Sequence, residues 1–238
     1  MVKLEVCVDD ALGLAEAVAG GADRIELCAA LAVGGLTSSV GLMALAVECG
    51  VPCYPMIRPR AGDFVFSRAD VAVMKADIRA AKAAGLPGVV LGASLPDGRL
   101  DSGVLAELVA EAAGLDLTLH RAVDLCPDVA EAVEQAVALG FKRILSSGGA
   151  QTAAQGLSRL ALMMQVANGR LVVMPGSGVS VQTLPALRQL PLTEVHASCA
   201  VPLATGGRAL EFGFQTAADK RTDRARVAEL KAALQIQT

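Results

Sequence analysis

Hydrophobic residues follow two alternating patterns along this chain of 238 residues. Short runs rich in Val, Ile and Leu have the length of buried strands, and the longer segments between them place Ala and Leu at helical spacing. The pattern predicts strands at 4–8, 24–28, 53–58, 88–93, 117–120, 143–147, 171–175 and 194–198. It predicts helices at 11–19, 67–84, 102–113, 128–139, 152–167 and 222–234. The chain therefore consists of about eight βα units.

Repeated βα units are typical of two folds, a closed (β/α)8 barrel and an open doubly wound sheet. A dinucleotide-binding sheet has a GxGxxG turn after its first strand, but here that turn reads Cys7-Val-Asp-Asp-Ala-Leu12. We therefore predict an α/β fold, a single-domain (β/α)8 TIM barrel over residues 1–203. We expect residues 204–238 to form a C-terminal helical extension that packs on the barrel or on a partner subunit.

Composition narrows the possible functions. Hydrophobic residues make up 53% of the chain and charged residues 19%, which excludes a disordered protein. A net charge of −3 and an aromatic content of 3% argue against nucleic-acid binding. The apolar runs are far shorter than a membrane span, and the chain starts with a strand rather than a signal peptide, so we expect a cytoplasmic protein. The high hydrophobic content favours a homo-oligomer, a dimer or larger.

The alternation of side chains along each strand predicts which residues face the barrel interior. On the first two strands, the aliphatic residues are expected to face the helices, which directs Glu5, Cys7, Glu26 and Cys28 inward. Burial of an unpaired charge is costly, so the inner charges should pair with one another or with a ligand. The same alternation directs inward the side chains of Arg58, His120, Ser147 and His196.

The inner cysteines suggest a metal site. We expect Cys7 and Cys28 at equivalent positions at the ends of two adjacent strands, which lie about 4.8 Å apart. Two thiolates so placed suit a soft cation, Cu(I) above all. In a closed barrel the eighth strand lies beside the first, which brings Cys199 close as a third sulfur. The alternative is that these buried cysteines act only as small hydrophobic residues.

Two glycine-rich loops suggest an anion site. Ser146-Ser-Gly-Gly-Ala150 and Pro175-Gly-Ser-Gly-Val179 follow the sixth and seventh predicted strands. Loops at these places in a barrel often bind phosphate through backbone N–H groups, although the same glycines also suit tight turns. Arginine guanidinium groups would supply the charge. The candidate anion-binding residues are Arg58, Arg60, Arg121, Ser147, Gly148, Gly149, Gly176 and Gly178.

Of the two histidines directed inward, His120 is the better candidate for proton transfer. An imidazole titrates near neutral pH, so His120 is the expected general acid or base, and Glu5 or Glu26 would orient it or act themselves. These residues predict an enzyme that acts on a small anionic metabolite, phosphorylated or not. The alternative is a structural or interaction barrel whose inner charges only form ion pairs.

Seven stretches of the sequence, in order, resemble the CutC family. They are residues 4–9, 20–28, 34–37, 56–60 with 62–63, 120–124, 147–149 and 174–179. The resemblance implies a (β/α)8 barrel, a cytoplasmic homo-oligomer and a role in copper homeostasis. It also implies that Cu(I) is bound by Cys7 and Cys28. We therefore expect a copper homeostasis protein, with an enzyme that uses His120 as acid or base as the alternative.

Overall fold

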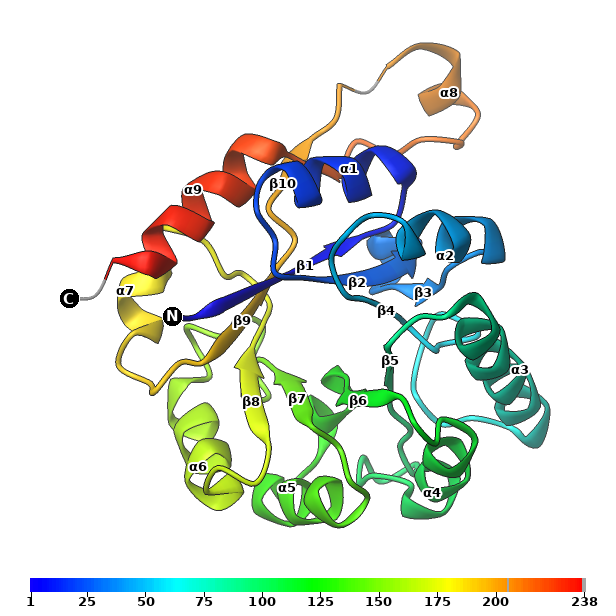
Figure 1. Ribbon diagram of the computed structural model, residues 1–238, viewed down its shortest axis with the longest axis vertical. Helices are drawn as coiled ribbons and strands as arrows, with labels where there is room; N and C mark the ends of the chain where they lie inside the picture. Colours follow the sequence, from blue (N-terminus) through cyan, green and yellow to red (C-terminus); the bar gives the residue numbers. More distant parts are fainter. Residues whose placement is uncertain (205, 237–238) are drawn as a thin grey trace.

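The computed structural model describes residues 1–204 and 206–236. Its centre is a ring of strands, and helices surround this ring on the outside (Figure 1). The strands of the ring are β1 (Lys3–Val8), β2 (Arg24–Ala29), β4 (Cys53–Pro55), β5 (Gly88–Leu91), β6 (Asp116–Leu119), β7 (Arg143–Ser146), β8 (Val172–Pro175) and β9 (Glu194–Ala197). The outer helices are α1 (Ala11–Ala19), α2 (Val40–Val47), α3 (Arg68–Ala84), α4 (Ser102–Glu111), α5 (Val129–Ala138), α6 (Leu157–Ala167), α7 (Leu184–Leu187) and α9 (Arg224–Gln235).

The ring strands follow the order of the chain. Parallel ladders join β9, β1, β2 and β4 in one group and β5, β6, β7 and β8 in a second. A parallel bridge between Met56 and Val90 connects the groups on one side, and β8 lies beside β9 on the other (Figure 1). This arrangement is a (β/α)8 barrel, so the predicted fold class is confirmed.

Alternation along the strands separates two regions of core. Leu4 and Val6 of β1, with Ile25 and Leu27 of β2, belong to the large hydrophobic cluster between the strands and the helices. A second cluster lies inside the barrel. The division of inner and outer residues on these strands matches the predicted one. The inner cluster consists of Cys28, Tyr54, Met56 and Val90, with Leu31 packed against it.

Helix α3 shows how local sequence sets an element. Ser67 and Asp70 form a reciprocal capping box at its start, and Gly85 ends it with a φ of +87°. The buried residues of the helix recur every three or four positions, which makes one face apolar. They are Val71, Met74, Ile78 and Ala81.

Helix α6 begins later than predicted. The sequence pattern placed its start at Thr152, but the helix starts at Leu157. The reason is a close contact of Gly156 with the preceding loop, where an added Cβ would lie 1.9 Å from the carbonyl oxygen of Ser147. Residues 150–156 therefore form turns, and Thr152 bonds to the side chain of Gln155 instead of capping the helix.

Short elements cover the carboxyl ends of the strands. Strand β3 (Leu36–Thr37) pairs antiparallel with the end of β2 and follows the 3-10 helix η1 (Leu31–Val33). A second 3-10 helix, η2 (Arg121–Leu125), follows β6 directly. These segments surround the opening of the barrel at the end where active sites form in this fold.

The C-terminal part contains an arm and a helix. Strands β10 (Ala200–Pro202) and β11 (Lys220–Thr222) form an antiparallel ribbon, and the arm with α8 (Gly207–Glu211) projects away from the barrel (Figure 1). Helix α9 packs against α1 and β1. Its buried residues, which belong to the same core as the barrel, are Val227, Leu230 and Leu234.

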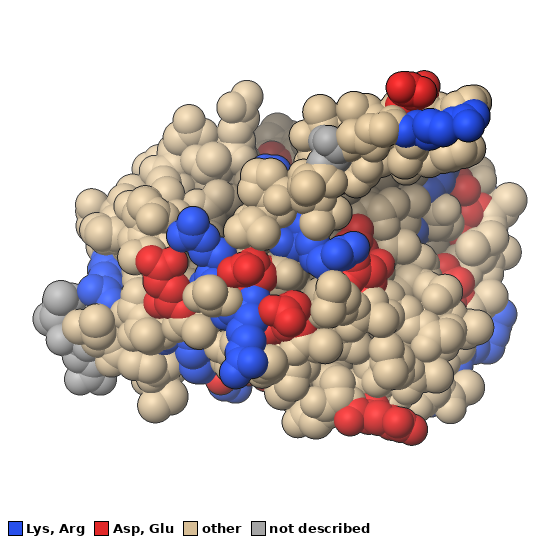
Figure 2. Space-filling model, turned by 90° about the horizontal axis from the view of Figure 1, so that it is seen from above, with Lys and Arg blue, Asp and Glu red and all other residues tan. Residues whose placement is uncertain are grey.

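The surface carries both signs of charge. On the face seen in Figure 2, Lys and Arg side chains lie among Asp and Glu side chains, with uncharged surface between them. Within the described residues, no helix combines the length and the apolarity needed to cross a membrane.

Candidate functional site

A cavity of about 330 Å³ lies at the carboxyl ends of the barrel strands. Strands and loops that are far apart in the sequence contribute its polar lining. The structure therefore brings together several side chains that the alternation argument directed inward. These are Cys7 from β1, Glu26 from β2, Arg58 after β4, His120 after β6 and His196 from β9.

Glu5 lies below the cavity rather than on its wall. Its Oε1 is 2.8 Å from His196 Nδ1, and its other oxygen pairs with Arg24. Burial alone would raise the pKa of Glu5, but Arg24 and His196 outweigh burial and lower the pKa to about 2. Glu5 is thus an ionised carboxylate that holds His196 in place, and it is not among the residues that line the cavity.

The base of the barrel contains an ion network that the sequence argument missed. Arg24 pairs with both Glu5 and Glu194, and the Nε of Arg143 is 3.3 Å from Glu194. The ring of Tyr54 lies 5.5 Å from the first guanidinium and 5.3 Å from the second. Alternation along the strands could have found these residues, because Arg24 shares a face with Glu26 and Glu194 shares one with His196.

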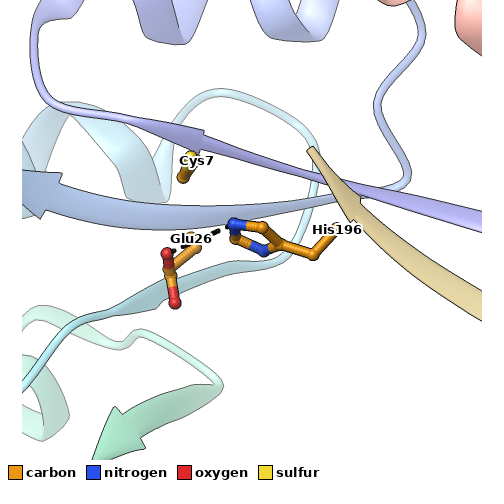
Figure 3. Close-up of side chains that lie close together, drawn as sticks. All are labelled: Cys7, Glu26 and His196. Carbon is orange, nitrogen blue, oxygen red and sulfur yellow. Dashed lines mark ion pairs between the residues drawn. The ribbon is translucent and has the colours of Figure 1, made fainter. Parts of the chain in front are cut away.

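Cys7, Glu26 and His196 form a compact cluster on the cavity wall (Figure 3). One potential metal-ligand atom from each lies within 4.8 Å of the others, and all three residues are buried. The Nε2 of His196 is 3.7 Å from Oε2 of Glu26. Burial alone would lower the pKa of His196, but Glu26, then Cys7 and Glu5, outweigh burial and raise it well above its usual value.

Cys28 is not at the position equivalent to Cys7. The parallel register pairs Cys7 with Glu26, so the expected equivalence of the two cysteines is wrong by two residues. Cys28 lies in the inner apolar cluster, with its Sγ 3.6 Å from Oε2 of Glu26. Burial raises its pKa well above the usual value. Cys199 is half-buried, and burial together with Cys7 raises its pKa to about 12.

His120 is held as a neutral imidazole. Its Nδ1 accepts a hydrogen bond of 3.2 Å from the backbone N–H of Ala122, and its ring packs on Phe64 with 4.7 Å between centroids. Burial and then the charge of Arg58 lower the pKa of His120 to about 3. Gly92 allows this placement, because an added Cβ there would lie 2.5 Å from the imidazole.

Arg58 is bound mainly by backbone oxygens. Its guanidinium donates to the carbonyls of Val33, Gly35 and Gly62 at 2.9, 3.0 and 2.7 Å. The side chain thus ties two loops to the cavity wall. Burial lowers its pKa, and the charge of neighbouring Arg60 adds to this effect. Arg60 is itself paired with Asp63 and Asp70, and it is absent from the cavity lining.

A carboxylate of the chain itself fills the first glycine-rich loop. Asp124 accepts hydrogen bonds from the backbone N–H groups of Ser147 and Gly149, and from Arg121. The N–H of Gly148 donates to the hydroxyl of Ser146. Asp124 thus occupies donors that the sequence argument assigned to a ligand anion. The sequence contains a signal for this contact, because Asp124 lies in the segment that directly follows the strand before the loop's own strand.

The second glycine-rich loop reaches the cavity. The N–H of Gly176 donates to the carbonyl of Ser146 within the barrel wall. Ser177 and Gly178 both line the cavity and have φ angles of +73° and +70°. Of the two loops, this one brings glycine backbone to the cavity.

Comparison with known proteins decides the family. A model of the CutC family matches residues 2–201. A CutC family protein of Rhizobium meliloti (strain 1021) is 56% identical over 235 residues, which cover 98% of this chain and 96% of the relative. One from Caulobacter vibrioides is 47% identical over 237 residues, with 98% and 97% covered. The chain belongs to the CutC family.

Solved structures agree with this assignment. The CutC protein of Streptococcus agalactiae, described as a proposed copper homeostasis protein, matches with a TM-score of 0.79 and 30% identity, covering 83% of this chain and 99% of that one. Thiamine phosphate pyrophosphorylase of Pyrococcus furiosus matches with a TM-score of 0.61 and 15% identity, covering 98% and 96%, and shows the fold alone. The region matched by the CutC family model contains the whole cavity lining and ends before α8 and α9.

Proposed function

We propose that this CutC family member is an enzyme that acts on a small anionic metabolite bound in the cavity. One observation carries the proposal. Oε1 of Glu26, Nε of Arg58 and Nε2 of His120 are buried, have no hydrogen-bond partner among the described residues, and belong to side chains that line the same cavity. An unpartnered buried polar group costs about 1–3 kcal/mol, so a ligand that bonds to these atoms would offset a real penalty.

The chemistry follows from His120 and its surroundings. Nδ1 accepts a hydrogen bond from the N–H of Ala122, so in the neutral imidazole Nε2 carries the proton and its N–H is free to donate to an oxygen of the ligand. The charge of Arg58 helps to keep the imidazole neutral in the empty site. An anionic ligand would counter that charge and raise the proton affinity of His120 when it binds. His120 is therefore the acid of the site, and its Nε2–H would polarise the ligand oxygen that accepts from it.

The rest of the cavity would orient the anion. Arg58 offers its remaining N–H, and the loop at Ser177 and Gly178 brings backbone close to the opening. Glu5 serves the site from below by holding His196. We expect the enzyme to work in the cytoplasm, because all six cysteines are free and scattered through a large domain.

Ligand screening tests this proposal. Inorganic phosphate, sulfate, simple carboxylates and small phosphorylated metabolites would be added while thermal unfolding is followed. We expect at least one anion to stabilise the wild type by about 2.7 kcal/mol at a hundred times its Kd. His120→Gln should keep the fold but lose the exchange of solvent deuterium into the bound ligand, followed by NMR.

Two results would overturn the proposal. One is a wild type that none of these anions stabilises. The other is a His120→Gln variant that exchanges deuterium as fast as the wild type. Arg68→Met is the matched control, because that side chain is 83% exposed and pairs with Glu107 far from the cavity, so it should bind and react like the wild type.

Copper binding is the second candidate function. The description of the Streptococcus agalactiae relative favours it, as does the position of Cys7 beside the imidazole of His196. In this alternative, Cys7 and Cys28 bind Cu(I), the cation that thiolates select. Anaerobic titration with Cu(I) against a chromophoric competitor should then give one tight ion per chain. Unchanged affinity in a double variant, Cys7→Ser with Cys28→Ser, would exclude this function.

Assembly into a homo-oligomer, a dimer or larger, also stays a proposal. Phe212 and Phe214 on the projecting arm are 60% and 87% exposed, which supports an apolar contact with a second copy. Light scattering after gel filtration tests it, and a monomer at micromolar concentration would contradict it.

A further inference from the structure

We propose that Cys7, Glu26 and His196 bind a zinc ion, with the fourth coordination position open to the cavity. Each of these residues offers one atom within 4.8 Å of the others, and they come from three adjacent strands, β2, β1 and β9 (Figure 3). The rigid wall of a barrel therefore supplies the whole tripod. The metal site stands on this geometry and does not depend on the proposed enzymatic function.

The spacing already approaches that of a tetrahedral site. Zinc bonds to histidine nitrogen and carboxylate oxygen at about 2.0–2.2 Å, which puts two tetrahedral ligand atoms about 3.3–3.6 Å apart. The observed separation of His196 Nε2 and Glu26 Oε2 is 3.7 Å. We expect side-chain rotations to close the set around an ion, because all three ligand atoms already lie within 4.8 Å of one another.

Neighbouring groups are placed as they are around known metal sites. A ligating histidine commonly donates its second ring N–H to a carboxylate, which orients the other nitrogen toward the metal. Here Nδ1 of His196 is 2.8 Å from Oε1 of Glu5, and Arg24 holds Glu5 in turn. Nε2 of His196 faces Oε2 of Glu26 at 3.7 Å, and it would bind the ion after losing its proton (Figure 3).

An unpartnered atom gives an independent sign of a missing ligand. Oε1 of Glu26 is buried and has no partner among the described residues, while Oε2 receives the weak S–H donor of Cys28 at 3.6 Å. A cation bound by both oxygens of the carboxylate would satisfy Oε1 as well as Oε2. The carboxylate of Glu26 and the thiolate of Cys7 would also balance the two positive charges of the ion.

The donor set distinguishes zinc from monovalent copper. Sulfur, imidazole nitrogen and carboxylate oxygen are all ordinary zinc ligands, whereas Cu(I) selects soft thiolate and thioether ligands. Three protein ligands beside a cavity are typical of catalytic zinc sites, which keep one position for water or substrate. The ion would there polarise an oxygen of a bound anion.

Metal titration tests the site, with Cys28→Ser as the matched control. Reduced, chelator-treated protein would be titrated anaerobically with Zn²⁺ against a chromophoric competitor. We expect one ion per chain in the wild type and in Cys28→Ser, because Cys28 lies outside the tripod. Cys7→Ser and Glu26→Gln should each lose at least about 100-fold in affinity, and the outer-shell variant Glu5→Gln about 10- to 100-fold.

A spectroscopic readout keeps the test independent of affinity. Co²⁺ in the same site should show a thiolate-to-metal charge-transfer band that is present in Cys28→Ser and absent in Cys7→Ser. Circular dichroism would confirm that each variant is folded. The proposal is overturned if the wild type binds no Zn²⁺, if Cys7→Ser binds it as tightly as the wild type, or if Cys28→Ser loses binding as Cys7→Ser does, which would assign the site to the thiol pair.

Discussion

His120 shows how one buried side chain makes stability depend on pH. Its folded pKa of about 3 lies below the ordinary value of 6.5. As the pH falls through that interval, the unfolded chain binds a proton that the folded chain does not. His120 therefore does not lower the stability above pH 6.5. Between pH 6.5 and about 3, His120 lowers the free energy of unfolding by about 1.4 kcal/mol for each unit by which the pH falls.

We expect His120→Gln to remove this part of the pH dependence. Urea unfolding of both proteins at a series of pH values below neutral would give the two slopes. The wild type should lose stability more steeply than the variant on acidification, because glutamine does not titrate. Parallel slopes would mean that His120 is protonated in the folded protein, and this would contradict its assignment as a neutral imidazole.

Arg24 is the residue on which the barrel base depends most. It pairs with Glu5 and with Glu194, and all three are buried. Removal of one partner from a buried ion pair leaves an uncompensated charge and typically costs about 3–5 kcal/mol. We expect Arg24→Met to lower the free energy of unfolding by this amount in urea titrations at neutral pH.

A surface arginine provides the comparison for Arg24. Arg68 pairs with Glu107, but its side chain is 83% exposed, and such pairs contribute about 0–1 kcal/mol. Arg68→Met should therefore leave the unfolding midpoint almost unchanged. A similar small loss in Arg24→Met would show that water or local rearrangement satisfies Glu5 and Glu194 when the guanidinium is gone.

Side-chain direction could be predicted at the residue scale, but partners could not. Alternation placed Glu26 and His120 on the inner wall because it depends only on position within one strand. The neighbour of Cys7 depends on the register between two strands, which pairs it with Glu26 and not with Cys28. Arg58 points inward as expected, yet its partners are carbonyl groups of loops that no sequence pattern specifies.

At the scale of elements, the contact between α1 and α9 depends on Gly20. An added Cβ there would lie 2.5 Å from Cβ of Val227 and 2.9 Å from the carbonyl oxygen of Arg224. The φ of Gly20 is −80°, so the effect of a larger residue is steric rather than conformational. We expect Gly20→Ala to destabilise the protein by about 1–3 kcal/mol, the usual cost of overpacking.

Gly103 is the control for this substitution. It lies in the first turn of α4, where an added Cβ would be 3.4 Å from Asp101 Oδ1. Alanine is the better helix former, so Gly103→Ala should stabilise the protein by about 0.4–1 kcal/mol in the same thermal unfolding experiment. Equal effects of the two substitutions would show that α9 does not pack tightly on α1 in solution.

Elements with strong local signals were predictable, and those shaped by distant contacts were not. Helix α3 has a capping box, an apolar stripe and a terminal glycine, all within its own sequence. Helix α2 lacks any helical contrast, because its sequence VGLMALAV is apolar on every face, and the pattern did not reveal it. The late start of α6 results from the approach of Gly156 to Ser147, a contact between segments that a periodic pattern cannot show.

At the scale of the whole molecule, the number of βα units together with the absence of a GxGxxG turn after the first strand was enough to predict the barrel. Parallel strands joined through helices follow one another around the ring, so chain order becomes spatial order. The role of the C-terminal segment is a different matter, because it depends on packing. We predicted a barrel over 1–203 with an extension after it, and that division stays a prediction. In the structure, α9 lies against α1 and β1 and contributes to the main core.

Truncation tests whether α9 is an extension or part of the barrel. Val227, Leu230 and Leu234 are buried, and Arg188 donates to the carbonyls of Ala233 and Ile236 at 2.6 and 2.9 Å. Burial of three such aliphatic side chains contributes about 5–9 kcal/mol, which is comparable to the 5–15 kcal/mol that stabilises a typical domain. We therefore expect a chain that ends at residue 223 to lose its cooperative unfolding transition.

Removal of the arm gives the matched comparison for that truncation. Residues 206–218 contribute no buried hydrophobic side chain to the core, and the ribbon of β10 and β11 lies at their base. A short Gly-Ser linker in their place should leave the midpoint of thermal unfolding within a few degrees of the wild type, because the core is untouched. A truncated chain that unfolds as cooperatively as this arm variant would show that the barrel is complete without α9, as the division at residue 203 requires.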